Sequence, residues 1–293
     1  MKPAPFEYFR PKTMEEALAF LARHPDEAKV IAGGQSLVPM MNFRMAQPAI
    51  LVDINGLKEL EFHQRDGQTM RIGALARHAV LLASSVLREA CPLVSDAYQY
   101  VAHGTVRNRG TLCGSLCHAD PAAEMPAVML ALGATMVLRS AGGEREVAVS
   151  DFLQGLYATA VQPDELLVEV RIPVTDSSMG YSFQEVSTRK GDFAMTLVAT
   201  LLSMQGGKIK TAVIVYGGVS DRAMRLQSIE QCLIGQVPSE SLFAEAANEA
   251  VHSIDVNEDV HGDREYRRDL MRTLTPRALA QAVARAQASA SNI

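Results

Sequence analysis

Tryptophan is absent from this chain of 293 residues, and aromatic residues make up only 5% of it. Cysteine is scarce as well. The four cysteines are too few and too scattered for a disulfide framework in a chain of this length, and they fit a reducing compartment. They are Cys91, Cys113, Cys117 and Cys232. The core must therefore be built mostly from Ala, Val, Leu, Ile and Met.

No region carries charge of one sign. The net charge is -5 with acidic and basic residues interspersed, so there is no basic stripe to neutralise a nucleic-acid backbone. The first seven residues lack the charged-then-apolar pattern of a signal peptide, and the longest apolar runs are too short for a membrane span. We expect a cytoplasmic protein that has no membrane span and does not bind nucleic acid.

Two common nucleotide-binding signatures are also missing. The chain contains neither the dinucleotide fingerprint G-x-G-x-x-G nor the phosphate loop G-x-x-x-x-G-K-[ST] in a matching context. This absence argues against the usual nicotinamide and ATP sites.

Hydrophobic periodicity indicates an α+β protein. Residues 13–22 have the apolar spacing of an amphipathic helix, and Thr13 with Glu16 has the spacing of a capping box. The pattern over residues 77–102 predicts two helical pieces that are separated at Cys91-Pro92, because a residue before proline disfavours the α conformation. A loop at 103–110 and a helix at 122–133 follow. The predicted strands of this part lie at 28–32, 51–54, 70–74 and 165–172, with a hairpin at 135–139 and 146–149.

A polar, glycine-containing stretch at 176–180 is the best candidate for a domain boundary. Beyond it, paired strands are predicted at 195–204 and 210–219, and helices at 228–233, 239–253 and 264–290. The chain is therefore expected to contain two successive subdomains, at 1–57 and 58–176. A smaller C-terminal domain of antiparallel strands and helices is expected at 177–293.

Two glycine-containing segments, 32–36 and 111–115, have the composition of anion-binding loops. Successive backbone N–H groups bind phosphate when no side chain obstructs them, and glycine permits that arrangement. Ser36, Thr111 and Ser115 add hydroxyl groups. Each segment alone is more often an ordinary tight turn. Together they indicate an anionic-cofactor site divided between two subdomains.

Two long motifs carry a resemblance to a known family. The first is IAGGQSLVPMMNFR at 31–44, and the second is VRNRGTLCGSLCHADP at 106–121. In this order they resemble the medium, FAD-binding subunit of the molybdenum hydroxylases, a family that includes carbon monoxide, quinoline and nicotine dehydrogenases. The likeness covers nearly the whole chain. It implies a two-subdomain FAD-binding fold of the PCMH type, followed by the smaller C-terminal domain.

The resemblance also assigns cofactor-binding residues, while no catalytic residue or metal ligand is expected. The FAD diphosphate would be held by two sets, Ala32, Gly33, Gly34, Gln35, Ser36 and Leu37, and Thr111, Leu112, Cys113, Gly114 and Ser115. Glu124 would lie near the ribose and adenine end. Lys190, Asp192 and Phe193 would lie beside the isoalloxazine ring, with Phe193 in a place where tyrosine is common.

Cys113 departs from the family pattern, which has glycine at this position. If the position needs φ > 0, cysteine costs roughly 1 kcal/mol; if it needs only closeness to phosphate, the thiol crowds the ligand. Cys113 and Cys117 are interpreted as ordinary buried thiols rather than metal ligands. His103 and His118 could contact the cofactor, although a structural role is favoured for each. Residues 107–109 are either a basic patch toward the diphosphate or a surface for a partner.

The implied function is electron relay. A large subunit with a molybdenum–pterin centre would hydroxylate the substrate, and two [2Fe-2S] clusters of a small subunit would pass electrons to this FAD and then to an external acceptor. The expected assembly is a dimer of heterotrimers, with an N-heterocycle slightly favoured as substrate. Two alternatives remain open. One is a self-contained FAD oxidoreductase. The other is an assembly subunit that has lost FAD, which is supported by Cys113 in place of the family's glycine.

Overall fold

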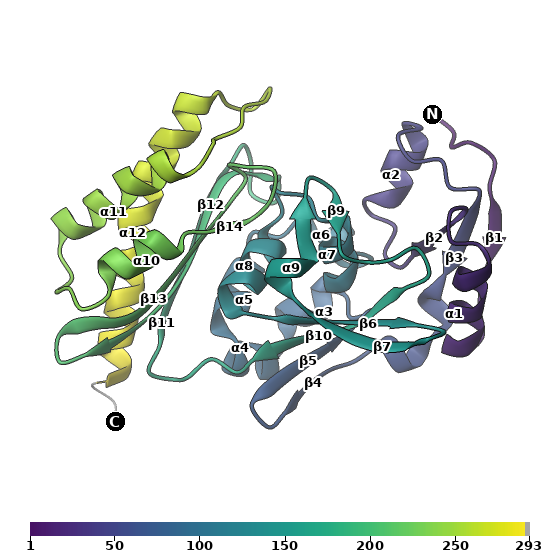
Figure 1. The fold of residues 1–293 in the computed structure, drawn as a ribbon, viewed down its shortest axis with the longest axis horizontal. Helices are drawn as coiled ribbons and strands as arrows, with labels where there is room; N and C mark the ends of the chain where they lie inside the picture. The colour runs from purple at the N-terminus through teal and green to yellow at the C-terminus, as the bar shows by residue number, and fades with distance from the viewer. Residues whose placement is uncertain (291–293) are drawn as a thin grey trace.

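The computed structural model describes residues 1–290 and contains three main sheets that follow one another along the long axis of the molecule (Figure 1). The N-terminal sheet lies at one end, a five-stranded sheet in the middle, and the C-terminal sheet with its helices at the other end. This mixture of helices and strands confirms the α+β class. Among the described residues, no helix is long and apolar enough to cross a membrane.

The N-terminal sheet has three parallel strands in the order β1-β3-β2. Its crossover helix α1 (Met14–Arg23) begins where predicted, because Thr13 accepts a hydrogen bond from the Glu16 amide, and its apolar face is buried. The helix connects β1 to β2, which lie on opposite sides of β3 and run parallel to it, and parallel strands require such a crossover connection. The other elements are β1 (Glu7–Phe9), β2 (Ala28–Ile31), β3 (Ile50–Asp53), α2 (Leu37–Asn42) and the 3₁₀ turns η1 (Ile54–Gly56) and η2 (Lys58–Leu60).

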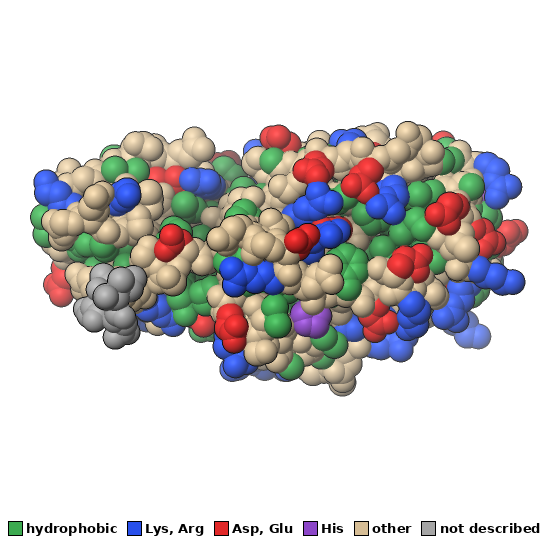
Figure 2. All heavy atoms as spheres, turned by 90° about the horizontal axis from the view of Figure 1, so that it is seen from below, with side chains coloured by type: hydrophobic (Ala, Val, Ile, Leu, Met, Phe, Trp, Pro, Cys, Tyr) green, Lys and Arg blue, Asp and Glu red, His purple; other side chains and the backbone are tan. Residues whose placement is uncertain are grey.

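The middle sheet is antiparallel, in the order β4-β5-β10-β6-β7. Its strands are β4 (His63–Asp66), β5 (Thr69–Gly73), β6 (Thr135–Ser140), β7 (Gly143–Ala148) and β10 (Leu166–Pro173). The predicted hairpin is confirmed, with Ser140 opposite Gly143. Glu169 on β10 forms ion pairs with Arg71 on the neighbouring strand β5 and with Arg171 on its own strand. In the view from below, acidic and basic side chains alternate over the middle of the molecule (Figure 2).

A run of short helices connects β5 to β6. They are α3 (His78–Ala83), α4 (Ser85–Ala90), α5 (Pro92–Ala97), α6 (Gly104–Arg107), α7 (Leu112–His118) and α8 (Glu124–Leu132). The prediction of two helical pieces over 77–102 was wrong, because a second break occurs at Ser84, whose hydroxyl caps α4. The predicted loop at 103–110 contains α6. The connection from β7 to β10 holds α9 (Val149–Phe152), β8 (Leu153–Gly155) and β9 (Ala158–Thr159).

The C-terminal sheet is antiparallel, in the order β11-β12-β13-β14, and three helices pack on one side of it (Figure 1). Gly206 and Gly207 form the predicted turn between β12 and β13, both with positive φ. The elements are β11 (Gly180–Ser187), β12 (Ala194–Gln205), β13 (Lys208–Gly217), β14 (Met224–Arg225), α10 (Gln227–Leu233), α11 (Glu240–Ser253) and α12 (Arg264–Ala290).

Two hydrophobic clusters form the core. One extends through the first two sheets and reaches the near face of the C-terminal sheet, while the other lies between that sheet and helices α10 to α12. Helix α12 lies so close to β11 that a Cβ at Gly180 would overlap the Ala282 carbonyl oxygen. Arg285 on α12 also pairs with Asp96 on α5 at 2.7 Å. The limits 1–57, 58–176 and 177–293 remain predictions.

Candidate cofactor-binding site

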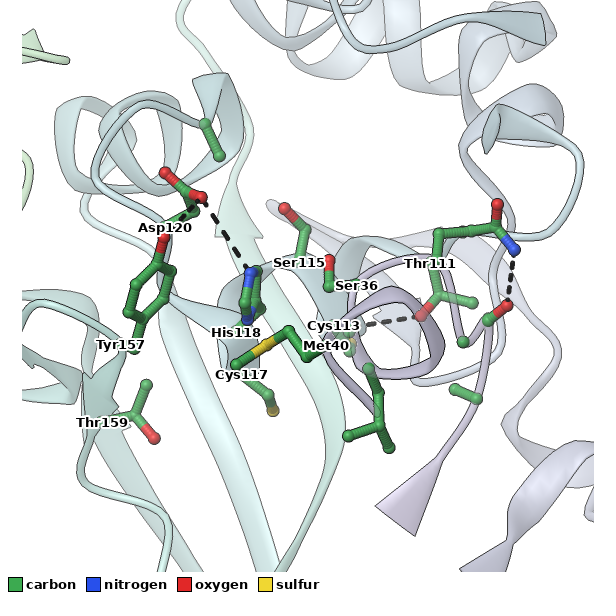
Figure 3. A pocket seen from close by; sticks show the side chains of 18 of the residues that line it. Ser36, Met40, Thr111, Cys113, Ser115, Cys117, His118, Asp120, Tyr157 and Thr159 are labelled. Atoms are coloured by element: carbon green, nitrogen blue, oxygen red, sulfur yellow. Dashed lines mark hydrogen bonds and ion pairs between the residues drawn. The ribbon is translucent and has the colours of Figure 1, made fainter. Parts of the chain in front are cut away.

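A cavity of about 1400 Å³ lies where the three sheet regions meet. Its walls come from the segment after β2, the start of α7, the start of α8, the β8–β9 region and the loop between β11 and β12 (Figure 3). Pockets for drug-sized molecules are typically about 300–1,000 Å³. This cavity therefore has room for a long ligand such as a dinucleotide.

The first glycine segment has two glycines for two different reasons. Gly34 has a φ of +71°, a conformation that side-chain-bearing residues rarely adopt. Gly33 has no such constraint, but a Cβ there would overlap the carbonyl oxygen of Arg109 and lie 2.7 Å from the Cα of Gly110. The segment is therefore pressed directly against the chain that leads into the second one.

The second segment is the first turn of helix α7 rather than a glycine loop, which corrects the sequence-based interpretation. Thr111 is the N-cap, and its hydroxyl oxygen accepts a hydrogen bond from the Gly114 amide at 3.1 Å. Helix N-termini present unpaired N–H groups and a positive dipole end, and both favour an anion. The feature that favours an anion here is the start of a helix rather than a glycine turn, and two of its first amides are already bonded within the protein, Leu112 to Ala76 and Gly114 to Thr111.

Cys113 lies in this helical turn and is not among the residues with positive φ. The condition for a penalty of about 1 kcal/mol is therefore not met. Its side chain is buried, its sulfur lies 4.0 Å from the Ile72 carbonyl oxygen on β5, and burial raises the pKa of the thiol. Cys117, in contrast, is exposed at the cavity, so the prediction of two buried thiols was wrong for Cys117.

Glu124 begins α8 and is buried at the cavity wall, with 5% of its surface exposed. Burial raises its pKa to about 7, and the charge of Asp120 adds to the rise. Glu185 on β11 behaves in the same way: burial and the charge of Glu124 raise its pKa to about 8. Both carboxyl oxygens of Glu185 are buried without a hydrogen-bond partner in the structure. Glu124 at the cavity wall is therefore accompanied by a second carboxyl group whose oxygens are buried, that of Glu185.

The loop between β11 and β12 closes another side. Asp192 and Phe193 line the cavity, and Phe193 leaves 59% of its surface exposed. Asp192 lies 3.5 Å from the ring of His103 and accepts a hydrogen bond from Arg189, which lowers the pKa of Asp192. Gly191 has a φ of +93° and lies against His103. The loop is therefore fixed to the segment that precedes α6.

Sequence comparison identifies two families. The FAD binding domain in molybdopterin dehydrogenase matches residues 4–175, and the CO dehydrogenase flavoprotein C-terminal domain matches residues 181–282. The chain belongs to the medium, FAD-binding subunits of the molybdenum hydroxylases.

Curated members of the family match along their full length. Caffeine dehydrogenase subunit beta of Pseudomonas sp. is 41% identical over 97% of both chains. The 6-hydroxypseudooxynicotine dehydrogenase complex subunit alpha of Paenarthrobacter nicotinovorans is 42% identical over 98% of this chain and 97% of its own.

Solved structures of the family have the same fold. Carbon monoxide dehydrogenase from Hydrogenophaga pseudoflava has a TM-score of 0.94 at 34% identity and covers 97% of this chain and 99% of its own. Quinoline 2-oxidoreductase from Pseudomonas putida 86 has a TM-score of 0.93 at 38% identity and covers 99% of both chains. The expected FAD-binding fold with a C-terminal domain is therefore confirmed.

The structure brings together nearly all the cofactor-binding residues that the family resemblance assigned. The exceptions are Leu112, which is fully buried, and Lys190, which is exposed outside the cavity lining. The residues at the cavity are Ala32, Gly33, Gly34, Gln35, Ser36, Leu37, Thr111, Cys113, Gly114, Ser115, Glu124, Asp192 and Phe193. Their role in holding FAD remains a prediction.

Sequence reasoning considered His118 as a possible cofactor contact but missed the residues that surround it at the cavity. The rings of His118 and Tyr157 stack with centroids 4.9 Å apart, and the Tyr157 hydroxyl donates to Asp120 at 3.3 Å (Figure 3). Burial lowers the pKa of His118, so its ring is largely neutral near pH 7. Tyr157 has a φ of +54°, and the residue pattern around it does not predict this left-handed conformation. Only the fold brings these three residues together.

Proposed function

We propose that this chain holds FAD across the cavity, with the diphosphate between residues 33–36 and the first turn of α7. The observation that carries the proposal is the direct contact of Gly33 with Arg109 and Gly110, which leaves no room for a side chain at Gly33 and brings residues of both segments to one cavity. A cleft with convergent amides suits an anionic diphosphate. Glu124 would lie toward the ribose, and Phe193 would cover the flavin ring.

The residues of the chain would then position the flavin, shield it from water and set its charge environment. FAD, when bound, supplies the redox chemistry, accepting and releasing electrons. No catalytic residue of this chain is required for such a relay. We further propose that electrons arrive from two [2Fe-2S] clusters on a small subunit, leave to an external acceptor, and originate at a molybdenum–pterin centre on a large subunit.

The substrate proposed for the large subunit is an N-heterocycle. Two relatives with high identity are named for caffeine and quinoline, at 41% and 38%, whereas the carbon monoxide dehydrogenase medium chains are 33% identical. Relatives named as subunits or as part of a complex support assembly with other chains. A dimer of heterotrimers in the cytoplasm is the arrangement we propose.

The alternative of an assembly subunit without FAD loses its main support. It depended on Cys113 disturbing the second segment, and this residue is a buried member of an undistorted helical turn.

An absorption spectrum of the purified complex tests the proposal. We expect the absorption bands of flavin in the purified complex. Denaturation followed by filtration should release this flavin from the protein as free FAD. If no flavin is present after reconstitution with excess FAD, the chain does not have the proposed function. If the chain binds FAD but purifies without a molybdenum and an iron–sulfur polypeptide, the relay is refuted and a self-contained oxidoreductase is favoured.

A further inference from the structure

Two residues outside the cavity lining, Asn55 and Arg77, connect the two phosphate-facing segments through their side chains. Asn55 lies in η1, directly after β3, and Arg77 precedes α3. Neither belongs to the glycine motifs. Both are partly buried behind the segments, where they bond to the backbone on either side.

Asn55 holds the first segment. Its amide nitrogen donates to the carbonyl oxygen of Ala32 at 2.8 Å, immediately before Gly33. The same nitrogen donates to Asp53, which also accepts from the Asn55 backbone amide at 2.9 Å and from the hydroxyl of Tyr8. Asn55 therefore bonds both to the end of the central strand β3 and to the first glycine segment.

Arg77 holds the second segment and joins it to Asn55. One guanidinium nitrogen donates to the Asn55 amide oxygen, and the other terminal nitrogen donates to the carbonyl oxygen of Arg109. Because arginine only donates, the Asn55 oxygen must face Arg77 and its nitrogen must face Ala32. The bonds thus connect the Ala32 carbonyl to the Arg109 carbonyl without a gap, and Arg77 is the donor on both of its sides.

The chain ends at the atom against which Gly33 is packed. The Arg109 carbonyl oxygen is the atom that a Cβ at Gly33 would overlap, so Arg77 fixes the oxygen that sets the separation of the two segments. The backbone around Arg77 is joined to the second segment as well: the His78 amide donates to the Gly110 carbonyl at 3.0 Å. The position of the α7 N-terminus therefore depends on Arg77.

We propose that Asn55 and Arg77 are positioning residues for the flavin diphosphate, acting as a brace that holds the two segments at the separation which the diphosphate requires. This inference rests on the proposed FAD-binding function. Neither residue of the brace lines the cavity. It lowers the cost of ordering both segments on binding, as preorganisation does in general.

The test is FAD titration of the flavin-free complex, followed by flavin fluorescence, for four variants. Arg77→Ala loses both bonds, and Arg77→Lys retains one. Asn55→Asp keeps an acceptor for Arg77 but loses the side-chain donor to Ala32 and to Asp53. Arg225→Lys is the matched control, because Arg225 is an arginine outside the cavity lining whose guanidinium likewise donates two hydrogen bonds, both to Glu230.

We expect the Kd for FAD to rise about tenfold in Arg77→Lys and in Asn55→Asp, and about a hundredfold in Arg77→Ala, since each lost hydrogen bond to a charged group corresponds to roughly a factor of ten. Arg225→Lys should bind as the wild type does. The thermal midpoint of the flavin-free protein should change little, because loop contacts belong to its less stable parts.

Two outcomes overturn the inference. One is a Kd within twofold of wild type in Arg77→Ala and Asn55→Asp. The other is a loss of affinity that follows the thermal midpoint and appears equally in Arg225→Lys, which would assign Arg77 to general folding. A wild-type complex that binds no FAD refutes the proposed function instead, so the two failures are distinguishable.

Discussion

The two segments that face the cavity have similar sequences and different physical constraints. In the first, both glycines are required, Gly33 by the close approach of another backbone and Gly34 by its left-handed conformation. In the second, Thr111 caps a helix, and Cys113 occupies a helical position that any residue can adopt. A glycine in a motif is therefore informative only when its conformation or its neighbours are known.

This comparison predicts that substitutions will have large effects in the first segment and small effects in the second. The difference arises because backbone overlap cannot relax without moving a whole segment, whereas a helical side chain can be exchanged in place. The predictions for Gly33, Gly34 and Cys113 below test that difference directly.

Gly33→Ala should have the largest effect. The added Cβ overlaps the Arg109 carbonyl oxygen, so the two segments must separate. Strain of this kind typically costs about 1–3 kcal/mol, and we expect the Kd for FAD to rise roughly a hundredfold. Gly104→Ala is the control, since nothing lies within 4 Å of its Cβ position. Equal FAD affinity in Gly33→Ala and wild type would show that the contact of Gly33 with Arg109 does not affect FAD binding.

Glu124→Gln should change how stability depends on pH. The folded state keeps the proton up to about pH 7, against an ordinary value of 4.5, so the stability contribution is full below pH 4.5 and is lost as pH rises through 7. Glutamine mimics the protonated form. We expect the variant to match wild type at pH 4 and to exceed it by about 3 kcal/mol at pH 8 in urea unfolding of the flavin-free protein. A constant difference at both pH values would contradict the assignment.

Gly34→Ala should have a smaller effect than Gly33→Ala, because its surroundings consist of flexible side chains. The Cβ position lies 3.2 Å from Ile31 and 3.3 Å from Val38, and the main cost is the φ of +71°. We expect a loss of about 1 kcal/mol in unfolding free energy. Gly34→Asn is the informative partner, since asparagine tolerates this conformation better. If alanine and asparagine behave alike, φ is not the constraint.

Cys113→Gly should have the smallest effect on the flavin. FAD binding should be equal or tighter, because the thiol is buried at 2% exposure within the helical turn. The protein itself should lose about 1 kcal/mol of stability, since glycine is a poor helix residue. Flavin content and a thermal melt of the same preparation measure both effects. A clear loss of flavin would show that the second segment has been misinterpreted.

Much of the fold follows from local patterns. The capped helix that begins at Met14, the hairpin of β6 and β7 and the paired strands β12 and β13 all occur where periodicity and turn residues place them. The short helices after β5 are harder, because their breaks depend on side-chain caps such as Ser84 and leave no glycine in the sequence.

The site was predictable only where the family resemblance assigns residues to it. Residues near 33 and 111 were identified by resemblance, whereas Asn55, Glu185 and Tyr157 lie outside the motifs. Their surroundings come from distant parts of the chain: Asn55 contacts Ala32 and Arg77, and Tyr157 contacts Asp120. Contacts of this kind leave no periodic signal in one sequence, so only the three-dimensional structure reveals them.

The attachment of helix α12 has a kinetic consequence. Arg285 donates to Asp96 on α5 and to the Tyr181 carbonyl oxygen, and its guanidinium lies over the Tyr181 ring. These bonds join the C-terminal region to the middle of the molecule, and every donor and acceptor in them is a protein group. The wall that carries Phe193 therefore stands in place before the cofactor arrives. Reconstitution with FAD should follow a single bimolecular phase whose rate is proportional to FAD concentration, with no slow domain closure afterwards.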